Sequence, residues 1–169
     1  KTIMKNKQIW VFGGAGHLGT PITKSLDAVC KKVICIDLDR RAEDLVARDS
    51  LSHTIPISLD ISFTDALVPT LEALIDREGI PDGVVNLTYS SSSQKNLAEL
   101  SVRDFQNTFD QSVAAFFATS RLFAERMSSN GGGSIVNFAS MYGLVSPDPA
   151  MYQPPMTPNP VDYGASKAA

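Results

Sequence analysis

Five short apolar segments alternate with stretches in which apolar residues recur at helical spacing, and this alternation strongly constrains the fold. The segments cover residues 8–12, 32–37, 54–60, 83–88 and 134–138. Each is short enough for a buried strand, so the chain is expected to form successive strand–helix–strand units. Units of this kind produce a parallel sheet with helices on both faces. The sequence therefore predicts an α/β fold with a doubly wound parallel sheet, in a single domain over residues 1–169.

Local signals predict where several elements begin. Pro56 has no N–H to donate to a ladder, so the strand at 54–60 should lie at an edge of the sheet. Ser62 and Asp65 have the spacing of a capping box, which predicts that a helix starts there. Pro69 lies inside this helix and should kink or shorten it.

The longest helical pattern starts at a second capping-box pair, Ser101 and Asp104, and extends to about Met127. Its buried stripe is predicted to be Phe105, Phe109, Val113, Phe116, Phe117 and Phe123. The helix after the first strand should bury Leu18, Ile22, Leu26 and Val29. After the fifth strand, residues 141–160 contain six prolines, which predicts a long surface loop of the kind that is often functional.

A cluster of glycines lies between the first strand and the helix that follows it. The sequence FGGAGHLG spaces Gly13, Gly16 and Gly19 three residues apart. Glycine allows a sharp turn and a close approach to a pyrophosphate, and the helix N-terminus supplies unpaired N–H groups. A tight turn without a ligand would also use these glycines, but the strand–loop–helix context favours a dinucleotide-binding loop that includes His17 and Leu18.

Acidic residues end the second and third strands. Asp37 lies where a carboxylate would accept the adenosine ribose hydroxyls and repel a 2′-phosphate, which favours NAD over NADP. Arg40 and Arg41 could bind such a phosphate instead. Asp60 and Ile61 could contact the adenine. Alternatively, Asp60 is an acidic residue that flanks the next helix.

A Tyr-x-x-x-Lys pair lies near the end of the chain. Tyr163 and Lys167 are about one helical turn apart, so their side chains should share a face. A neighbouring ammonium favours a phenolate, and we therefore expect Lys167 to lower the pKa of Tyr163. Alone, the two would be an ordinary helix pair; after a complete nucleotide-binding half, they predict catalysis.

The order of these features resembles the short-chain dehydrogenase/reductase family over Lys7–Ala169. The features in order are the glycine loop, Asp37, Asp60, Ile61, Ser140, Tyr163 and Lys167. The resemblance implies an NAD(P)-binding Rossmann fold, with Tyr163 exchanging a proton with the substrate oxygen while hydride moves. It also implies that Lys167 binds the nicotinamide ribose and that Ser140 hydrogen-bonds the substrate oxygen.

The chain departs from the family pattern at three places. Phe12 precedes the glycines where threonine is usual, and NLTY at 86–89 keeps only Asn86 of Asn-Asn-Ala-Gly. Asn86 is nevertheless assigned to the cofactor site. Ser112 stands where the family has the asparagine of its proton relay, which assigns Ser112 to catalysis. Because serine is shorter, it should lose the helix distortion and the water that the asparagine holds.

Three functions follow from these features. The first is an NAD-dependent oxidoreductase acting on a secondary alcohol or ketone, including a sugar. The second is a nucleotide-sugar epimerase or dehydratase with recycled NAD, because the long interval between Ser140 and Tyr163 resembles the extended family members. The third is a nucleotide-binding protein with decayed catalysis, suggested by Phe12, NLTY and Ser112.

Composition excludes several other classes. A net charge of -3 and a pI of about 5.3 argue against a nucleic-acid partner, and no apolar stretch is long enough to cross a bilayer. Cys30 and Cys35 are expected to be reduced, and two histidines provide no apparent metal set. A cytoplasmic protein with a small-molecule substrate is predicted.

The resemblance implies that the natural chain continues beyond Ala169. Family members carry further strands and a substrate-binding part, so the sheet here should be incomplete at its C-terminal end. The fifth strand would then lack a neighbour on one side. A homodimer or homotetramer is expected for the full-length protein, formed through the long helix and the helix that begins near Tyr163.

Overall fold

The structure is a computed structural model that describes residues 4–62, 64–92 and 95–169. The predicted domain therefore includes residues 1–3, 63 and 93–94, which lie outside the described part. Five parallel strands form one sheet in the order β3-β2-β1-β4-β5. The strands are β1 (Gln8–Phe12), β2 (Lys32–Asp37), β3 (Thr54–Ser58), β4 (Gly83–Asn86) and β5 (Ser134–Asn137). The predicted parallel α/β fold is confirmed, and so is the edge position of β3.

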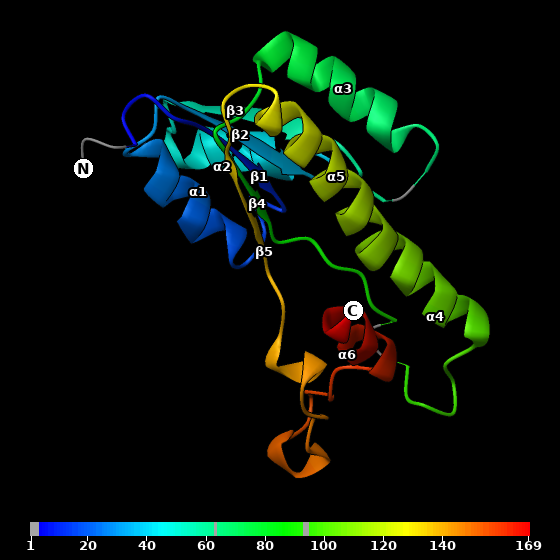
Figure 1. Cartoon of the computed structure of the whole chain (residues 1–169). Helices are drawn as coiled ribbons and strands as arrows, with labels where there is room; N and C mark the ends of the chain where they lie inside the picture. Colours follow the sequence, from blue (N-terminus) through cyan, green and yellow to red (C-terminus); the bar gives the residue numbers. More distant parts are fainter. Residues whose placement is uncertain (1–3, 63, 93–94) are drawn as a thin grey trace.

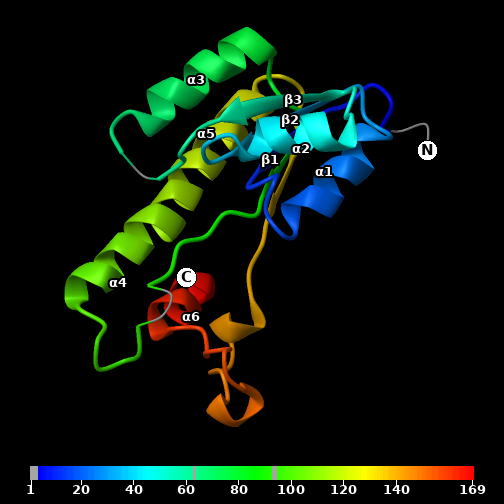
Figure 2. The same ribbon diagram turned by 180° about the vertical axis from the view of Figure 1, so that it is seen from behind.

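Helices cover both faces of the sheet, as Figures 1 and 2 show from opposite sides. The helices α1 (Gly19–Asp27) and α2 (Arg41–Asp49) lie on one face. On the other lie α3 (Leu67–Glu78) and α5 (Ala115–Ser128). Alternate residues of a strand point to opposite faces, so Ile9 and Val11 pack under the first pair of helices and Trp10 and Phe12 under the second.

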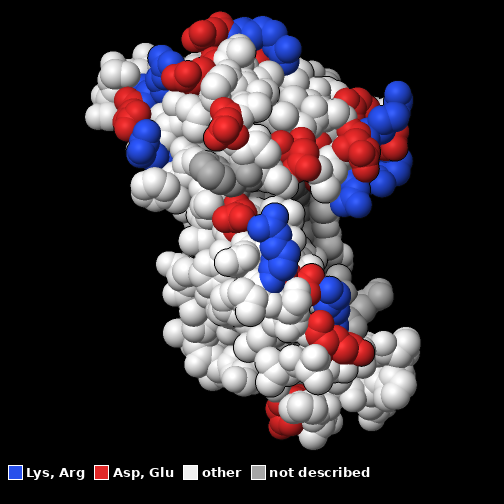
Figure 3. Space-filling model, turned by 90° about the vertical axis from the view of Figure 1, so that its right-hand side faces the viewer, with Lys and Arg blue, Asp and Glu red and all other residues white. Residues whose placement is uncertain are grey.

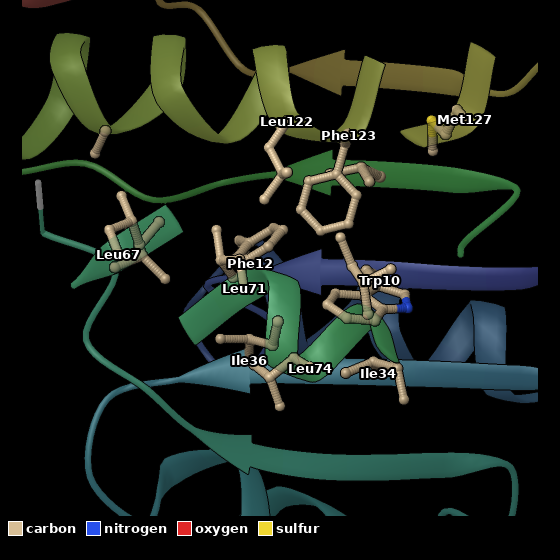
Figure 4. Packing of buried hydrophobic residues seen from close by; sticks show 14 residues of the cluster. Trp10, Phe12, Ile34, Ile36, Leu67, Leu71, Leu74, Leu122, Phe123 and Met127 are labelled. Atoms are coloured by element: carbon tan, nitrogen blue, oxygen red, sulfur yellow. The ribbon is translucent and has the colours of Figure 1, made fainter. Parts of the chain in front are cut away.

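The larger core lies between the sheet and helices α3 and α5 (Figure 4). Phe123 of α5 meets the rings of Trp10 and Phe12 edge-on, with centroids 5.2 and 5.8 Å away. Edge-to-face aromatic pairs of this kind add to the stabilisation that comes from burying the rings. Strand β1 is therefore held to the long helix by aromatic contacts.

Helix α3 starts later than its capping-box signal predicted. The helix begins at Leu67, with Ala66 as its N-cap and no side-chain cap. The amide and hydroxyl of Ser62 instead donate to Asp60 Oδ1, at 2.9 and 2.7 Å. The later start places Pro69 in the first turn, where a missing N–H has no helical acceptor to lose. The predicted shortening is therefore observed, and the predicted helix start is wrong.

The long helix contains a π-helical turn that changes which side is buried. It consists of α4 (Val102–Phe109), the π turn η1 (Asp110–Ala114) and α5, and the predicted Ser101–Asp104 capping box is confirmed. The buried residues are Thr108, Ser112, Ala115, Thr119, Leu122, Phe123 and Met127. Of the predicted stripe, only Phe123 is buried, whereas Phe117 is exposed. A π turn inserts an extra residue per turn, so a stripe drawn at regular helical spacing loses its phase.

After β5, the chain extends away from the sheet (Figure 1). Strand β5 pairs with β4, and no described residue pairs with its other edge. The proline-rich segment 141–160 is a loop with two 3₁₀ turns, η2 (Met141–Gly143) and η3 (Pro149–Met151), as its composition predicted. It leads into α6 (Val161–Ala168), which contacts η2 and α4. Among the described residues β5 is thus an edge strand, as expected.

Charge is mixed on the surface that Figure 3 shows. Acidic and basic side chains are interspersed on this face rather than gathered into a basic patch, and its lower part is largely uncharged. In the described part of the chain, no helix is both long and apolar enough to cross a membrane.

Candidate active site

A cavity of about 560 Å³ lies where the carboxyl ends of the strands meet the glycine loop and α6. Ligands of open α/β sheets bind at this edge, outside the carboxyl ends of the strands. The cavity is lined by ten of the predicted site residues, namely Gly13, Gly16, His17, Leu18, Gly19, Asp37, Asp60, Ile61, Tyr163 and Lys167. Residues from the two ends of the sequence therefore share one site.

The glycine loop has the close packing that its sequence suggested. Gly13 has a φ of +73°, which favours glycine, and the Cβ of any other residue at Gly19 would lie 2.0 Å from the Gly13 carbonyl oxygen. The backbone amides of His17, Leu18 and Gly19 have no hydrogen-bond acceptor within the described residues. The start of α1 thus presents free donors to the cavity. Leu18 is exposed there, so its predicted place in the core under α1 is wrong.

Asp37 connects the end of β2 to the glycine loop. Its Oδ2 accepts a hydrogen bond from the Ala15 amide and its Oδ1 accepts one from the Leu38 amide, both at 2.8 Å. Asp37 is buried apart from a small surface in the cavity. A carboxylate has further lone pairs, so these bonds leave it able to accept a ribose hydroxyl. Arg41 also lines this end of the cavity.

Asp60 lies farther along the same wall. Its carboxylate is held by Ser62, and both residues line the cavity together with Ile61. Ile61 is buried in the larger core, so only part of it faces the cavity. The apolar side chains of Leu38 and Leu59 complete this end, which suits a flat aromatic ring.

Helix α6 brings Tyr163 and Lys167 to the opposite end of the cavity. Lys167 Nζ donates to the Phe138 carbonyl oxygen at 3.0 Å and lies 5.2 Å from the centre of the Phe116 ring. Burial lowers the pKa of the Lys167 ammonium, because an apolar environment disfavours its charge. The Tyr163 ring meets the Tyr89 ring edge-on at 5.6 Å. A phenol and an amine thus lie at one end of a cavity whose other end has free amide donors.

Comparison with known families agrees with this arrangement. The model of the short chain dehydrogenase family matches residues 7–169, which is nearly the whole chain. The chain belongs to the short chain dehydrogenase family. The Rossmann fold and the family resemblance predicted from the motifs are thereby confirmed.

Individual family members are similar at moderate identity. A 7α-hydroxysteroid dehydrogenase from Bacteroides fragilis is 28% identical over 170 residues, which cover 97% of this chain and 61% of that protein. An NADPH-dependent pterin aldehyde reductase from Arabidopsis thaliana is 26% identical over 147 residues, covering 84% of this chain and 60% of the relative. The chain spans about three-fifths of the length of these curated relatives.

A solved structure shares the fold. A short chain dehydrogenase from Leptospira borgpetersenii with bound NAD+ superposes with a TM-score of 0.78 at 22% identity, over 98% of this chain and 61% of that one. At this identity the likeness concerns the fold alone.

Three predicted site residues do not line the cavity. Ser140 is the N-cap of η2, where its Oγ accepts from the Tyr142 amide at 3.2 Å. Asn86 is buried, with its Oδ1 bound to the amide and hydroxyl of Thr88. Ser112 is buried in the π turn and its Oγ accepts from the Ser90 amide at 2.9 Å. Contrary to the expectation, the distortion of the long helix is present with serine at this position.

The sequence prediction missed other cavity residues, among them Ser62, Thr88, Tyr89 and Gln111. Tyr89 carried a signal, because it stands where the short chain dehydrogenase pattern has glycine. That departure was interpreted as a sign of decay, whereas the structure places a large aromatic residue against Tyr163. Ser62 was missed because its spacing to Asp65 was assigned to a helix cap.

The cysteines lie away from this site. Both are free and buried, and burial raises the pKa of Cys35 to about 12, which keeps it a thiol. Within the described residues, no three histidine, cysteine, aspartate or glutamate side chains come together as a metal site.

Proposed function

We propose that this protein is an NAD-dependent oxidoreductase that transfers hydride between the nicotinamide and a secondary alcohol or ketone. One observation carries the proposal: a single cavity is lined by the glycine loop, Asp37 and the Tyr163–Lys167 pair. These residues come from opposite ends of the chain, and neither the fold nor the packing of the core requires a phenol and an amine beside a dinucleotide loop. Family membership supports the same reaction class.

The cavity fits a dinucleotide. The free amides at the start of α1 would hold the pyrophosphate, Asp37 the adenosine ribose, and Ile61 and Asp60 the adenine. The buried carboxylate of Asp37 would repel a 2′-phosphate, so NAD is proposed over NADP. Arg41 also lines the cavity and could bind the 2′-phosphate of NADP, and one similar protein is named as NADPH-dependent.

The bound nicotinamide would supply hydride chemistry, and the residues of the chain would handle the proton. Tyr163 would give its phenolic proton to the substrate oxygen during reduction and take it back during oxidation. Lys167, held by the Phe138 carbonyl, would bind the nicotinamide ribose and place a positive charge near the phenol. A protonated lysine and a tyrosine on one face of α6 can thus act as one acid–base unit.

Two serines are proposed to support this unit. Ser140 accepts one hydrogen bond, and its hydroxyl donates to no residue in the described part of the chain, so it could donate to the substrate oxygen. Ser112 is proposed to support the proton path by fixing the loop that carries Ser90, to which it is bonded. Asn86 is proposed to hold the turn after β4 in place beside the cofactor.

The substrate class follows from the chemistry of the site. Among the described residues that line the cavity near Tyr163 are the uncharged side chains of Thr88, Ser90 and Gln111, and none is a carboxylate, which suits an uncharged carbonyl or carbinol. A similar protein is named as a hydroxysteroid dehydrogenase, which is consistent with a secondary alcohol. A sugar substrate, a cytoplasmic location and a homodimer or homotetramer belong to the same proposal.

The test is NADH absorbance during incubation of the purified protein with NAD+ and a panel of secondary alcohols, polyols and hydroxysteroids. We expect NADH to accumulate with at least one of them. Tyr163→Phe should lower turnover about 100- to 10,000-fold while leaving NADH affinity unchanged. Tyr152→Phe, which removes a hydroxyl from the loop outside the cavity, is the matched control and should retain turnover.

Two results would overturn the proposal. Conversion of a nucleotide sugar without any change in NADH would instead indicate an epimerase or dehydratase. NADH binding by calorimetry with no turnover, for both the parent and Tyr163→Phe, would indicate a nucleotide-binding protein without catalysis.

A further inference from the structure

Asp162, the residue before Tyr163, is a completely buried carboxylate that the proposed chemistry does not use. Its exposed fraction is 0%. Its Oδ2 accepts hydrogen bonds from the Thr108 hydroxyl at 2.6 Å and from the Ser92 amide at 2.7 Å. Thr108 is buried in α4, and Ser92 lies in the loop after β4. One side chain therefore joins α6 to two elements that are distant in sequence.

Burial and these hydrogen bonds act on the pKa of Asp162 in opposite directions. Burial alone would raise the pKa of Asp162, but the hydrogen bonds from Thr108 and Ser92 outweigh it and hold the pKa below its usual value. The carboxylate also lies in the first turn of α6, where the helix dipole favours negative charge. A buried charge without such partners would be strongly unfavourable, so α6 is held where both donors can reach Oδ2.

Little of α6 is buried, and its other side-chain contacts are those of Lys167 with Phe138 and Phe116 and of Tyr163 with Tyr89. Only Asp162 and Ser166 are buried among its residues, and Val161 is largely exposed. Its backbone touches η2 closely, since a Cβ at Gly143 would lie 2.6 Å from the Lys167 carbonyl oxygen. A helix of eight residues is marginal without tertiary contacts. The position of α6 therefore depends on the close contact with η2, on the contacts of Lys167, and on the bonds of Asp162.

We propose that Asp162 is a positioning residue that acts through Thr108 and Ser92 to set the place of Tyr163 in the active site. The bond from Ser92 connects α6 to the loop that carries Tyr89, whose ring packs against Tyr163. The cluster of Asp162, Thr108 and Ser92 lies outside the cavity and thus orients the phenol of Tyr163 without contacting a ligand. This inference rests on the proposed function only for its kinetic consequence.

The test uses Thr108→Val, Thr108→Ser and Asp162→Ala. Thr119→Val is the matched control, because Thr119 is also buried in the long helix and its hydroxyl has no partner among the described residues. Hydrogen exchange of the α6 amides measures how firmly α6 is held and does not require an active enzyme. Steady-state kinetics and NADH calorimetry then test whether Tyr163 is correctly placed.

We expect Thr108→Val to speed exchange at Tyr163–Lys167 and to lower kcat about tenfold, with KM and NADH affinity little changed, because a small misplacement of a catalytic group is costly. Asp162→Ala should lower kcat about 100-fold. Thr108→Ser keeps the hydroxyl and should behave like the parent, as should Thr119→Val. Exchange in β1 and β2 should not change in any variant.

Unchanged α6 exchange in both Thr108→Val and Asp162→Ala would overturn the inference. So would faster exchange with an unchanged kcat, since Tyr163 would then not depend on the anchor. If the parent converts no substrate, the proposed function fails. The anchoring role of Asp162 is then tested by exchange alone: it is supported if exchange of the α6 amides rises in Thr108→Val and not in Thr108→Ser, and it is overturned otherwise.

Discussion

Strands β1 and β5 belong to the same parallel sheet, yet they differ in burial and in the number of neighbouring strands. Four of the five residues of β1 are buried, whereas three of the four residues of β5 are exposed. Strand β1 has strands on both sides and helices on both faces, and β5 has one neighbouring strand. The half of the candidate site that contains the glycine loop is thus part of the core, whereas the half that contains Tyr163 and Lys167 lies beside it.

This difference shows in how each half holds its functional residues. The glycine loop is held by backbone bonds to Ile36 and by the carboxylate of Asp37, directly at the ends of buried strands. Tyr163 and Lys167 lie on a short helix that hydrogen bonds hold to α4 and to the loop after β4. We infer that changes in the first half act on stability and cofactor binding together, and changes in the second mainly on catalysis.

The largest effect is expected for Gly19→Ala. Its Cβ would lie 2.0 Å from the Gly13 carbonyl oxygen and 2.7 Å from the Gly14 Cα, so loop and helix must separate. We expect a loss of about 3 kcal/mol or more in unfolding free energy, and loss of NADH binding. Urea unfolding and calorimetry measure the two.

Gly16→Ala is the matched control for this clash. Its Cβ would meet only the Gly13 carbonyl oxygen, at 3.3 Å, so its cost in stability should be below about 1 kcal/mol. Equal destabilisation by the two variants would contradict the idea that packing of α1 on the loop makes Gly19 necessary.

A second prediction compares the same substitution in the two strands. Val11 in β1 has an exposed fraction of 0% and Val136 in β5 one of 46%. Val11→Ala should lower the unfolding free energy by about 2 kcal/mol, because it leaves a cavity in the core, and Val136→Ala by less than about 0.5 kcal/mol. Urea midpoints of the two variants check this. Similar losses would mean that β5 is covered in the protein in solution.

A third prediction concerns Asp37, which is expected to affect both the stability of the fold and cofactor binding. Asp37→Asn keeps one oxygen acceptor and so can satisfy only one of the amides of Ala15 and Leu38. We expect a loss of about 1–2 kcal/mol in stability and a smaller preference for NADH over NADPH. Calorimetry with both cofactors measures the preference. An unchanged ratio would show that Asp37 only supports the loop.

The smallest expected effect is the pH dependence of the α6 anchor. The pKa of Asp162 is lower in the folded protein than in the unfolded chain, so its carboxylate contributes stability above about pH 4. That contribution is lost as the pH falls through the folded value. After correction for the intrinsic pH dependence of exchange, the exchange rate of the α6 amides should therefore stay constant between pH 7 and 5. It should rise at lower pH, where Asp162 becomes protonated.

Asp162→Asn should weaken this acid dependence, whereas the exposed Asp65→Asn should leave it as in the parent. An acid response of α6 that is the same in Asp162→Asn and the parent would assign it to other carboxylates. Asp82 is one such group: burial would raise its pKa, but the bonds from Lys7 and the Gln8 amide hold it below its usual value.

Much of the site was accessible from the sequence because its residues follow strands. Gly13, Asp37 and Asp60 come directly after β1, at the end of β2 and shortly after β3, and parallel strands end at the same edge. Tyr163 and Lys167 were identified by their spacing in a motif. The face of the long helix was predicted wrongly, because the π turn at 110–114 breaks the regular period that the prediction assumed.

The sequence by itself determined the parallel α/β fold and the glycine loop and predicted the proposed acid–base pair, since each depends on local spacing and on apolar runs. Only the tertiary structure decided that Ser112 binds the backbone of Ser90, that Tyr89 packs on Tyr163, and that Asp162 meets Thr108 54 positions away. Those contacts join segments that have no periodic relation in the sequence. The two polar contacts satisfy hydrogen-bonding groups that the fold buries, and which partner lies within reach is decided by how the elements pack.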